Sequence, residues 1–318
     1  MSSTLSLSSL TQYVFLASIA YVLAGAPLLS LFYGTRASHP SDASAGHHGA
    51  RLDGLVFPEE NLRCGEHAYR GVYVLRRDPL VVYIEGFLSA EEAGHVVGLS
   101  EPLFTPSTTW TGHAEYLNKT IRNSEKAPLP RDDVVKCIED RARRFQGWRP
   151  WMFIEKLWTQ RYGAGGHYTY HYDWSTGTQK SGRVSSFMVY VAANCTGGGT
   201  HFPRLERPRG REWCRFIECE EEMDGVEEQG VAGTNATSQS GKSEGKEVDL
   251  RQGVIFKPVA RNAVFWENMR SDGTGYLESW HAGLPVKSGV KVGLNVWSWF
   301  QEGFVPPVEE QGRVGGGE

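Results

Sequence analysis

The 318-residue sequence lacks a concentrated basic stripe, and its formal net charge at pH 7 is only −4. Domains that bind nucleic acid usually carry a clustered excess of Lys and Arg, so we expect no nucleic-acid partner. No internal repeat is apparent. The cysteines also lack the Cys-x-x-Cys spacing of a zinc knuckle or a thioredoxin-like motif, so we expect them to serve structure.

The cysteines number five, and an odd count leaves at least one thiol free or joined to another chain. Cys214 and Cys219 are close enough in sequence for a small loop disulfide. The sequence does not otherwise fix a pairing among Cys64, Cys137, Cys195, Cys214 and Cys219.

Charged side chains are absent before Arg36, and residues 13–33 are almost wholly apolar. About 20 helical residues, rising roughly 1.5 Å each, cross a hydrocarbon core of about 30 Å. We therefore expect residues 1–34 to be an uncleaved signal anchor that holds the protein in a membrane. The alternative is a cleavable signal peptide, cut near Ala24-Gly25-Ala26 and followed by secretion.

The orientation in the membrane is predicted from glycosylation signals, because no Lys or Arg precedes the apolar run. Asn-x-Thr sequons begin at Asn118, Asn194 and Asn235. They favour a glycoprotein whose folded body lies in the lumen of the endoplasmic reticulum.

Further domain boundaries follow composition. Residues 35–53 are rich in Ser, Ala, Gly and His and are predicted to be a flexible stem. Residues 54–150 are expected to form a support region of helices and strands, and residues 151–304 the main core. Within that core, residues 220–247 predict a mobile acidic insertion, and residues 305–318 a disordered tail.

Two helices are predicted in the support region. Ser89 is a good N-cap with Glu92 at the capping-box position, and a second helix is expected from Asp132 to about Phe145. Most of the remaining pattern consists of short β-like runs between Gly and Pro residues. The runs are 80–84, 153–157, 168–172, 185–192, 254–257, 263–266 and 290–299. This predicts a mainly β (α+β) protein with a jelly-roll core.

A candidate metal site begins with His171 and Asp173, which end the stretch YGAGGHYTYHYD from Tyr162. Side chains two residues apart on an extended backbone point the same way. With a third imidazole from His281 they would form one face of an octahedron around Fe(II), leaving three positions open. A competing pair, His113 and Glu115, lacks downstream partners of this kind.

The order of motifs resembles that of the prolyl 4-hydroxylase group of Fe(II)/2-oxoglutarate-dependent dioxygenases, over roughly residues 78–299. Members carry Tyr-x-x-Gly-x-x-Tyr-x-x-His-x-Asp, and they carry Lys ten residues after a distal His. The matching residues here are Tyr162, Gly165, Tyr168, His171, Asp173, His281 and Lys291.

The resemblance implies a double-stranded β-helix in which His171, Asp173 and His281 hold Fe(II). It implies that Lys291 pairs with the distal carboxylate of 2-oxoglutarate, helped by the hydroxyls of Tyr162 and Thr200. It also implies use of O2 and ascorbate, and a peptide or protein substrate whose proline becomes 4-hydroxyproline while 2-oxoglutarate yields succinate and CO2.

Substrate-groove roles are implied for Glu155, Tyr168, Arg183 and Trp297. The sequence departs from the family nearby: Gly199 stands where Glu is usual, Asn123 interrupts Arg-Thr-Ser, and Trp158 replaces a common Gln. We expect His167 and His201 to be structural rather than ligands, because a fourth protein ligand would block oxygen. Alternative functions are oxygenation of another side chain or a small molecule, and a non-catalytic jelly-roll glycoprotein. The sequence does not indicate the oligomeric state.

Overall fold

A computed structural model describes residues 54–304, except 58, 60, 111–113, 148, 175–177 and 220–247. These residues belong to one compact unit that begins at Gly54. Several predictions lie outside the described residues: the signal anchor and stem, the acidic insertion, the tail, the Asn235 sequon, and His113 of the competing pair. Among the described residues, no helix is both long enough and apolar enough to cross a membrane.

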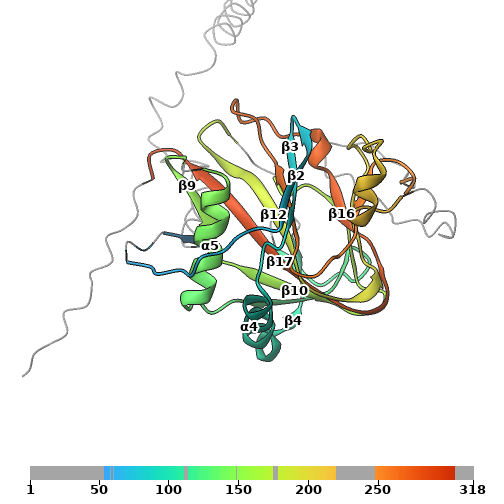
Figure 1. The fold of residues 1–318 in the computed structure, drawn as a ribbon, viewed down its shortest axis with the longest axis horizontal. Coiled ribbons are helices and arrows are strands. Elements are labelled where there is room, and N and C mark those ends of the chain that lie inside the picture. Colours follow the sequence, from blue (N-terminus) through green and yellow to red (C-terminus); the bar gives the residue numbers. More distant parts are fainter. Residues whose placement is uncertain are drawn as a thin grey trace, which may run out of the picture. The chain divides into compact units, whose positions relative to one another are not determined.

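The described chain is mainly β, with two large sheets (Figure 1). The ten-stranded sheet has the order β2-β3-β15-β12-β17-β10-β8-β4, with β1 and β9 attached beside β17. Its strands are β1 (Leu55–Val56), β2 (Gly71–Arg77), β3 (Leu80–Glu85), β4 (Thr105–Pro106), β8 (Glu125–Pro128), β9 (Met152–Glu155), β10 (Trp158–Tyr162), β12 (Ser181–Gly197), β15 (Ala263–Glu267) and β17 (Val286–Gln301).

The five-stranded sheet has the order β14-β13-β16-β11-β7. Its strands are β7 (Arg122–Asn123), β11 (His167–His171), β13 (Thr200–Phe202), β14 (Val254–Phe256) and β16 (His281–Gly283). A small hairpin, β5 (Thr109–Trp110) with β6 (Glu115–Tyr116), stands apart from both sheets. Within the described residues the strands of each sheet pair antiparallel, as a jelly roll requires.

The ten-stranded sheet is buried on both faces because its central strands are apolar at successive positions. Val82 and Ile84 face a core that includes the helices, whereas Val81 and Tyr83 pack toward the five-stranded sheet. This is the period-two alternation of a pleated strand. The long strands β12 and β17 pair along almost their whole length in the middle of the sheet. Residues of β12 contribute to both cores.

Two helices cover the first of these cores: α4 (Ala90–Ser100) and α5 (Asp133–Phe145). The predicted capping box is confirmed, since Ser89 Oγ accepts from the backbone of Glu92 and the Glu92 carboxylate accepts from the backbone of Ser89. Asp132 caps α5 with its side chain, which accepts from the backbone N–H of Val135. Three short 3-10 helices, Glu101–Leu103, Arg211–Arg215 and Leu277–Ser279, complete the described helical structure.

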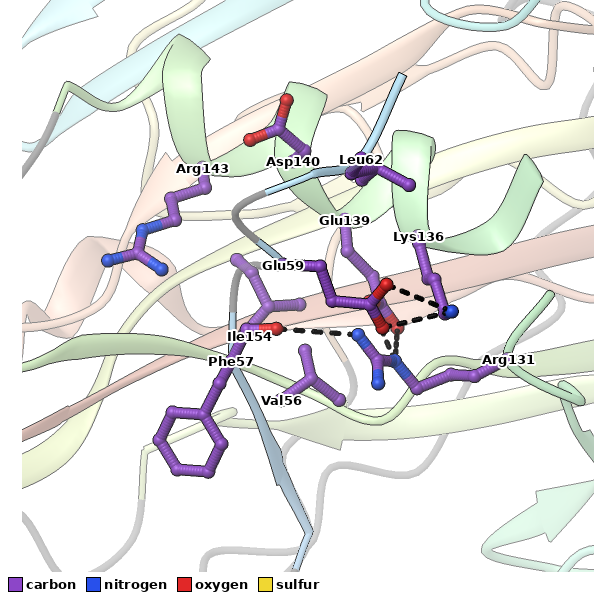
Figure 2. A pocket seen from close by; sticks show the side chains of 10 residues that line it. All are labelled: Val56, Phe57, Glu59, Leu62, Arg131, Lys136, Glu139, Asp140, Arg143 and Ile154. Atoms are coloured by element: carbon purple, nitrogen blue, oxygen red, sulfur yellow. Dashed lines mark hydrogen bonds and ion pairs between the residues drawn. The ribbon is translucent and has the colours of Figure 1, made fainter. Parts of the chain in front are cut away.

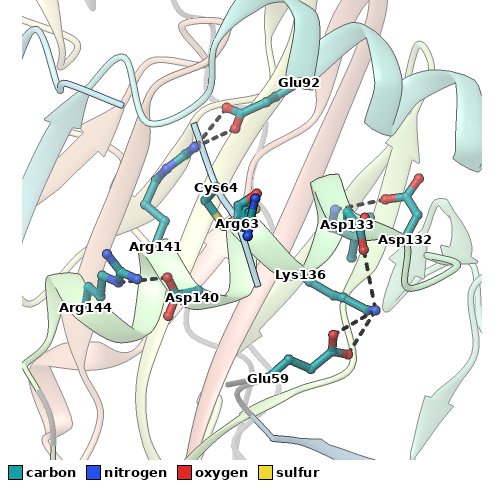
Figure 3. The surroundings of a disulfide bond; sticks show 12 residues. Glu59, Arg63, Cys64, Glu92, Asp132, Asp133, Lys136, Asp140, Arg141 and Arg144 are labelled. Atoms are coloured by element: carbon teal, nitrogen blue, oxygen red, sulfur yellow. Dashed lines mark hydrogen bonds and ion pairs between the residues drawn. A yellow bond between two sulfur atoms is a disulfide. The ribbon is translucent and has the colours of Figure 1, made fainter. Parts of the chain in front are cut away.

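Two disulfides tie down surface segments. Cys64–Cys137 joins the chain before β2 to α5, in a neighbourhood where Arg141 pairs with Glu92 and Lys136 with Glu59 (Figure 3). Cys214–Cys219 closes the short loop predicted from the sequence, and that prediction is confirmed. Among the described residues Cys195 is the free thiol.

The predicted strands are present, but their boundaries differ, and the described residues contain further strands that the sequence pattern does not predict. The run predicted at 185–192 belongs to a strand that extends from Ser181 to Gly197, because its polar ends continue to pair with β17. β2 and β10 were not predicted. In β10 the buried residues include Thr159 and Gln160, whose polarity hides the strand in the sequence.

Candidate active site

The predicted metal ligands meet at the end of the five-stranded sheet. His171 ends β11, His281 begins β16, and the two lie opposite each other in the strand register. Asp173 follows β11 two residues later. One ligand atom from each of His171, Asp173 and His281 lies within 4.8 Å of the others. The sheet pairing thus accounts for how a histidine more than a hundred residues downstream reaches the His-x-Asp pair.

Backbone hydrogen bonds fix both imidazole rings in the same way. Nδ1 of His171 lies 2.8 Å from the carbonyl of Thr169, and Nδ1 of His281 lies 2.8 Å from the carbonyl of Ser279. A carbonyl only accepts, so each Nδ1 must carry the proton. This assigns the lone pair to Nε2 of each ring, which is the tautomer that a metal ligand needs.

Asp173 presents one carboxylate oxygen to the protein and the other toward the histidines. Its Oδ2 accepts from the hydroxyl of Ser186 at 2.6 Å and from the indole N–H of Trp297 at 3.0 Å. Its Oδ1 lies 3.7 Å from Nε2 of His171. Burial disfavours the charged form, but His281, Arg183 and these hydrogen bonds outweigh burial and lower the pKa of Asp173 to about 2.

Burial and the neighbouring His281 lower the pKa of His171 to about 3, so the ring is neutral at physiological pH. Aromatic side chains enclose the two rings. Tyr168 stacks on His171 with ring centroids 3.8 Å apart, and Trp266 lies edge-on to His281 at 4.8 Å. The site therefore combines an ionised carboxylate with neutral imidazole and a largely apolar surround.

Lys291 lies in the interior on β17, opposite Tyr162 of β10 in the strand register. Its Nζ donates to the carbonyl of Gly198 at 2.6 Å and lies 4.6 Å from the centroid of the Tyr162 ring. None of the described carboxylates forms an ion pair with it. Burial lowers the pKa of Lys291 to about 8, because the charged ammonium is poorly solvated there. Pairing with an anion would offset this effect.

Thr200 is buried on β13 and accepts a hydrogen bond from the Tyr190 hydroxyl at 2.8 Å, which leaves its own proton for another acceptor. The preceding glycines allow a close crossing of strands. A Cβ on Gly199 would lie 2.6 Å from Cγ2 of Ile255, so the Glu that the family usually carries there would require Ile255 to move. Gly198 adopts φ +72°, which disfavours other residues.

The predicted groove residues gather beside the metal ligands, and three of the four line a pocket of about 360 Å³. These three are Tyr168, Arg183 and Trp297. Glu155 is not among the lining residues, but it pairs with Arg183 through two hydrogen bonds of 2.7 and 2.8 Å. Arg183 also donates to the backbone carbonyl of Asp173 at 3.0 Å and stacks over the Trp297 ring.

The remaining wall of this pocket holds residues whose roles the sequence did not indicate. They include Trp158, which departs from the family pattern, and Arg122, which precedes the departing Asn123 and stacks over Tyr168. The other lining residues are Thr108, Thr109, Glu115, Lys126 and Gln160. Lys126 lies over the Trp158 ring and donates to Thr108.

His167 and His201 make hydrogen bonds to groups other than the ligands. The His167 ring contacts the carbonyls of Gly165 and Thr120, and His201 is buried between the Tyr170 hydroxyl and the carbonyl of Gln252. A separate small pocket beside α5 is lined by charged groups that pair with one another, such as Arg131 with Glu139 (Figure 2). None of the predicted site residues lines it.

Ser186 and Asn268 carry no sequence pattern that marks them as site residues, yet they lie behind the candidate ligand Asp173. Asn268 Nδ2 donates to the Ser186 hydroxyl at 2.8 Å, and that hydroxyl bonds Asp173. Single small polar residues in or beside a strand form no recognisable motif. The available signal is that both are polar residues beside apolar strand residues, at positions where an apolar side chain is more usual.

The donor set fits a divalent iron. Two imidazoles whose Nδ1 atoms face backbone carbonyls, and one carboxylate whose Oδ2 is hydrogen-bonded to protein, form the 2-His-1-carboxylate set that non-haem Fe(II) oxygenases use. Structural zinc sites instead close with four protein ligands, and the cluster found among the described residues has three.

Comparisons with known proteins agree with this donor set. Residues 157–299 match the family model of the 2OG-Fe(II) oxygenase superfamily. Prolyl 4-hydroxylase 5 of Arabidopsis thaliana is 29% identical over 237 residues, covering 72% of this chain and 71% of that protein. Prolyl 4-hydroxylase subunit alpha-2 of Caenorhabditis elegans is 24% identical, and the match covers 71% of this chain but 35% of the subunit. The chain thus spans about a third of that relative.

One solved structure similar to this chain is a viral collagen prolyl hydroxylase from Paramecium Bursaria Chlorella virus-1 in its 2OG complex. It is 22% identical, with a TM-score of 0.44, and the match covers 69% of this chain and 96% of that one. The sequence comparisons agree with one another: residues 157–299 resemble the 2OG-Fe(II) oxygenase superfamily, and the similar proteins named above are prolyl 4-hydroxylases.

Proposed function

We propose that the protein is an Fe(II)- and 2-oxoglutarate-dependent dioxygenase that hydroxylates proline in a peptide or protein substrate. The observation that carries the proposal is the convergence of His171, Asp173 and His281, with each imidazole held in the tautomer that leaves Nε2 free. In this proposal the two sheets form the double-stranded β-helix that the resemblance implies.

The three side chains would hold iron through two imidazole nitrogens and one carboxylate oxygen. Iron in such a site, together with 2-oxoglutarate and O2, supplies the oxidising power to replace a C–H bond by C–OH while the cosubstrate loses CO2. Ascorbate would keep the iron reduced. The rings of Tyr168 and Trp266 cover part of the ligand set and would limit the access of water, which would protect the reaction from side reactions.

Lys291 is the proposed anchor for the distal carboxylate of 2-oxoglutarate. It is buried and charged below a pKa of about 8, and its neighbours offer further hydrogen bonds. A carboxylate brought into this interior is stabilised only if a fixed cation meets it. The Thr200 hydroxyl accepts from Tyr190, so its own proton can be donated to the same carboxylate. For Tyr162, the hydrogen bonds to Ser124 and Arg122 orient the phenol near Lys291.

The pocket of about 360 Å³ next to the ligands is the proposed place for the substrate residue. Tyr168 and Trp297 present aromatic surface, and the Arg183–Glu155 pair keeps the charge of Arg183 balanced. Aromatic faces pack well against the flat pyrrolidine ring of proline. The relatives named prolyl 4-hydroxylase support proline as the residue modified.

Incubating the full chain with Fe(II), 2-oxoglutarate, ascorbate and proline-rich peptides is expected to release succinate and add one oxygen atom to proline. Mass spectrometry of the peptide and a succinate assay measure the two products. Succinate release with oxidation of another residue or of a small molecule would replace the proline assignment. No succinate with any peptide pool would favour a non-catalytic glycoprotein.

We also propose that the protein is a single-pass protein of the endoplasmic reticulum membrane with a lumenal catalytic domain. The apolar run at residues 13–33 supports the anchor, and two disulfides suit an oxidising compartment. The Asn194 sequon lies exposed on β12.

An endoglycosidase should lower the apparent mass of the protein expressed in eukaryotic cells. The shift should disappear when Asn118, Asn194 and Asn235 are all replaced by Gln. An unglycosylated wild-type chain would contradict the lumenal location.

A further inference from the structure

The carboxylate of Asp173 is held by a chain of hydrogen bonds that begins away from the ligand set. Asn268 Nδ2 donates to Ser186 Oγ at 2.8 Å, and Ser186 Oγ donates to Asp173 Oδ2 at 2.6 Å. Ser186 and Asn268 are both fully buried. Trp297 Nε1 makes a second hydrogen bond to the same oxygen at 3.0 Å.

The direction of this chain is fixed by chemistry. An ionised carboxylate only accepts, so the single proton of the Ser186 hydroxyl must point to Asp173. The hydroxyl can then take a donor only on its lone pairs, and the Asn268 amide nitrogen fills that place. Asn268 is itself held at its backbone, where its N–H donates to Val184 and its carbonyl accepts from Tyr276.

The number of oxygens that Asp173 gives to the metal matters, because the proposed reaction needs open coordination positions. Three protein ligands would leave three positions of a six-coordinate iron, and the proposed reaction would need these positions for 2-oxoglutarate and oxygen. A carboxylate that binds through both oxygens would occupy one of these positions. Two donors on Oδ2 hold that oxygen toward protein and leave Oδ1 facing His171.

We propose that Ser186 and Asn268, with the indole of Trp297, are positioning residues that restrict Asp173 to binding metal through Oδ1 alone. This inference rests on the proposed function, because it assigns roles around the same metal. It also gives Trp297 a task besides lining the substrate pocket. Ser186 and Asn268 are not among the residues that line the substrate pocket, and the side-chain hydrogen bonds described for them reach neither His171 nor His281.

The neighbouring residue provides a matched control. Ser185 is also buried on β12, but strand alternation turns it to the opposite face, where its hydroxyl donates to the Gln146 side chain after α5. Ser185→Ala and Ser186→Ala therefore remove the same atom from adjacent buried positions. Only the second removes a hydrogen bond to the proposed ligand.

The test is titration of the metal-free full chain with Mn(II), with free Mn(II) followed by electron paramagnetic resonance. Outer hydrogen bonds to ligands typically contribute about 10–100-fold to metal affinity. We expect Ser186→Ala to weaken Mn(II) binding by about 10-fold or more, Asn268→Ala to weaken it through the same hydroxyl, and Ser185→Ala to stay within about 2-fold. Since Ser186 and Asn268 act in one chain, their double variant should lose less than the product of the single losses.

A spectroscopic readout separates positioning from general loosening. The visible spectrum of bound Co(II) should change in Ser186→Ala and Trp297→Phe, because an untethered Oδ2 becomes free to bind, but not in Ser185→Ala. Trp297→Phe keeps an aromatic ring and remains a test if Ser186→Ala fails to fold. Wild-type affinity and an unchanged Co(II) spectrum in a folded Ser186→Ala or Trp297→Phe protein would overturn the inference, as would equal losses in Ser185→Ala. A wild-type chain that binds no Mn(II) would overturn the proposed function as well.

Discussion

Replacing His171 by alanine is expected to reduce 2-oxoglutarate turnover to below about 1% of the wild-type rate. The ring supplies one of three donors whose ligand atoms lie within 4.8 Å of one another, and two donors hold a labile metal poorly. Succinate release with saturating Fe(II) measures the loss. Binding of Mn(II) to the metal-free protein checks that the loss begins with the metal.

His167 supplies the matched control for this prediction. It lies on the same strand, four residues earlier, and its imidazole makes hydrogen bonds to the carbonyls of Gly165 and Thr120. His167→Ala should therefore keep activity within a few-fold of wild type. If His171→Ala retained more than about a tenth of the activity, or if His167→Ala failed equally, the ligand assignment would be wrong.

Replacing Lys291 by methionine should raise the concentration of 2-oxoglutarate needed for half-maximal activity by about 100-fold. Leaving a buried carboxylate without its cation costs about 3–5 kcal/mol, and part of that penalty is avoided if the ligand binds less deeply. Methionine is chosen because it keeps a similar length without the charge. Lys287→Met on the same strand removes an exposed cation and should leave the 2-oxoglutarate requirement unchanged.

The pKa of Lys291 adds a pH dependence to the same interaction. In the protein without ligand, burial lowers that pKa to about 8, and a bound carboxylate would raise it again. Below pH 8 the ammonium is charged before and after binding, so affinity is flat. Above pH 8 binding must take up a proton, and the affinity should fall by up to about tenfold per pH unit.

Calorimetry in buffers of different ionisation enthalpy would detect this proton uptake between pH 8 and 9. Lys291→Met should show neither the proton uptake nor the decline in affinity. A wild-type affinity that stays constant to pH 9.5 would show that Lys291 does not meet the carboxylate.

The sequence was informative where a local pattern has a local cause. The His171-x-Asp173 pair predicted two side chains on one side of a strand, and the Ser89–Glu92 capping box predicted the start of α4. Both depend only on backbone geometry over a few residues. His281 and Lys291 came from the family resemblance. Their place beside the pair depends on the β11–β16 and β10–β17 registers, which no short motif encodes.

The sequence did not indicate the positions of polar residues that are buried in the interior. Thr159 and Gln160 make β10 look like a loop, yet both are buried between neighbouring strands. Ser186 and Asn268 lie on different strands or strand ends and meet only across the sheet. A serine next to another serine gives no sign of which one faces the ligands, because that depends on the register of the whole strand.

Labelling with heavy-isotope O2 tests the central account most directly. The account predicts that one labelled oxygen atom enters the hydroxylated proline and the other enters succinate, in equal amounts and only with Fe(II) and 2-oxoglutarate present. The His171→Ala protein should incorporate neither. Unlabelled succinate together with unlabelled peptide, at normal substrate consumption, would contradict a dioxygenase built on His171, Asp173 and His281.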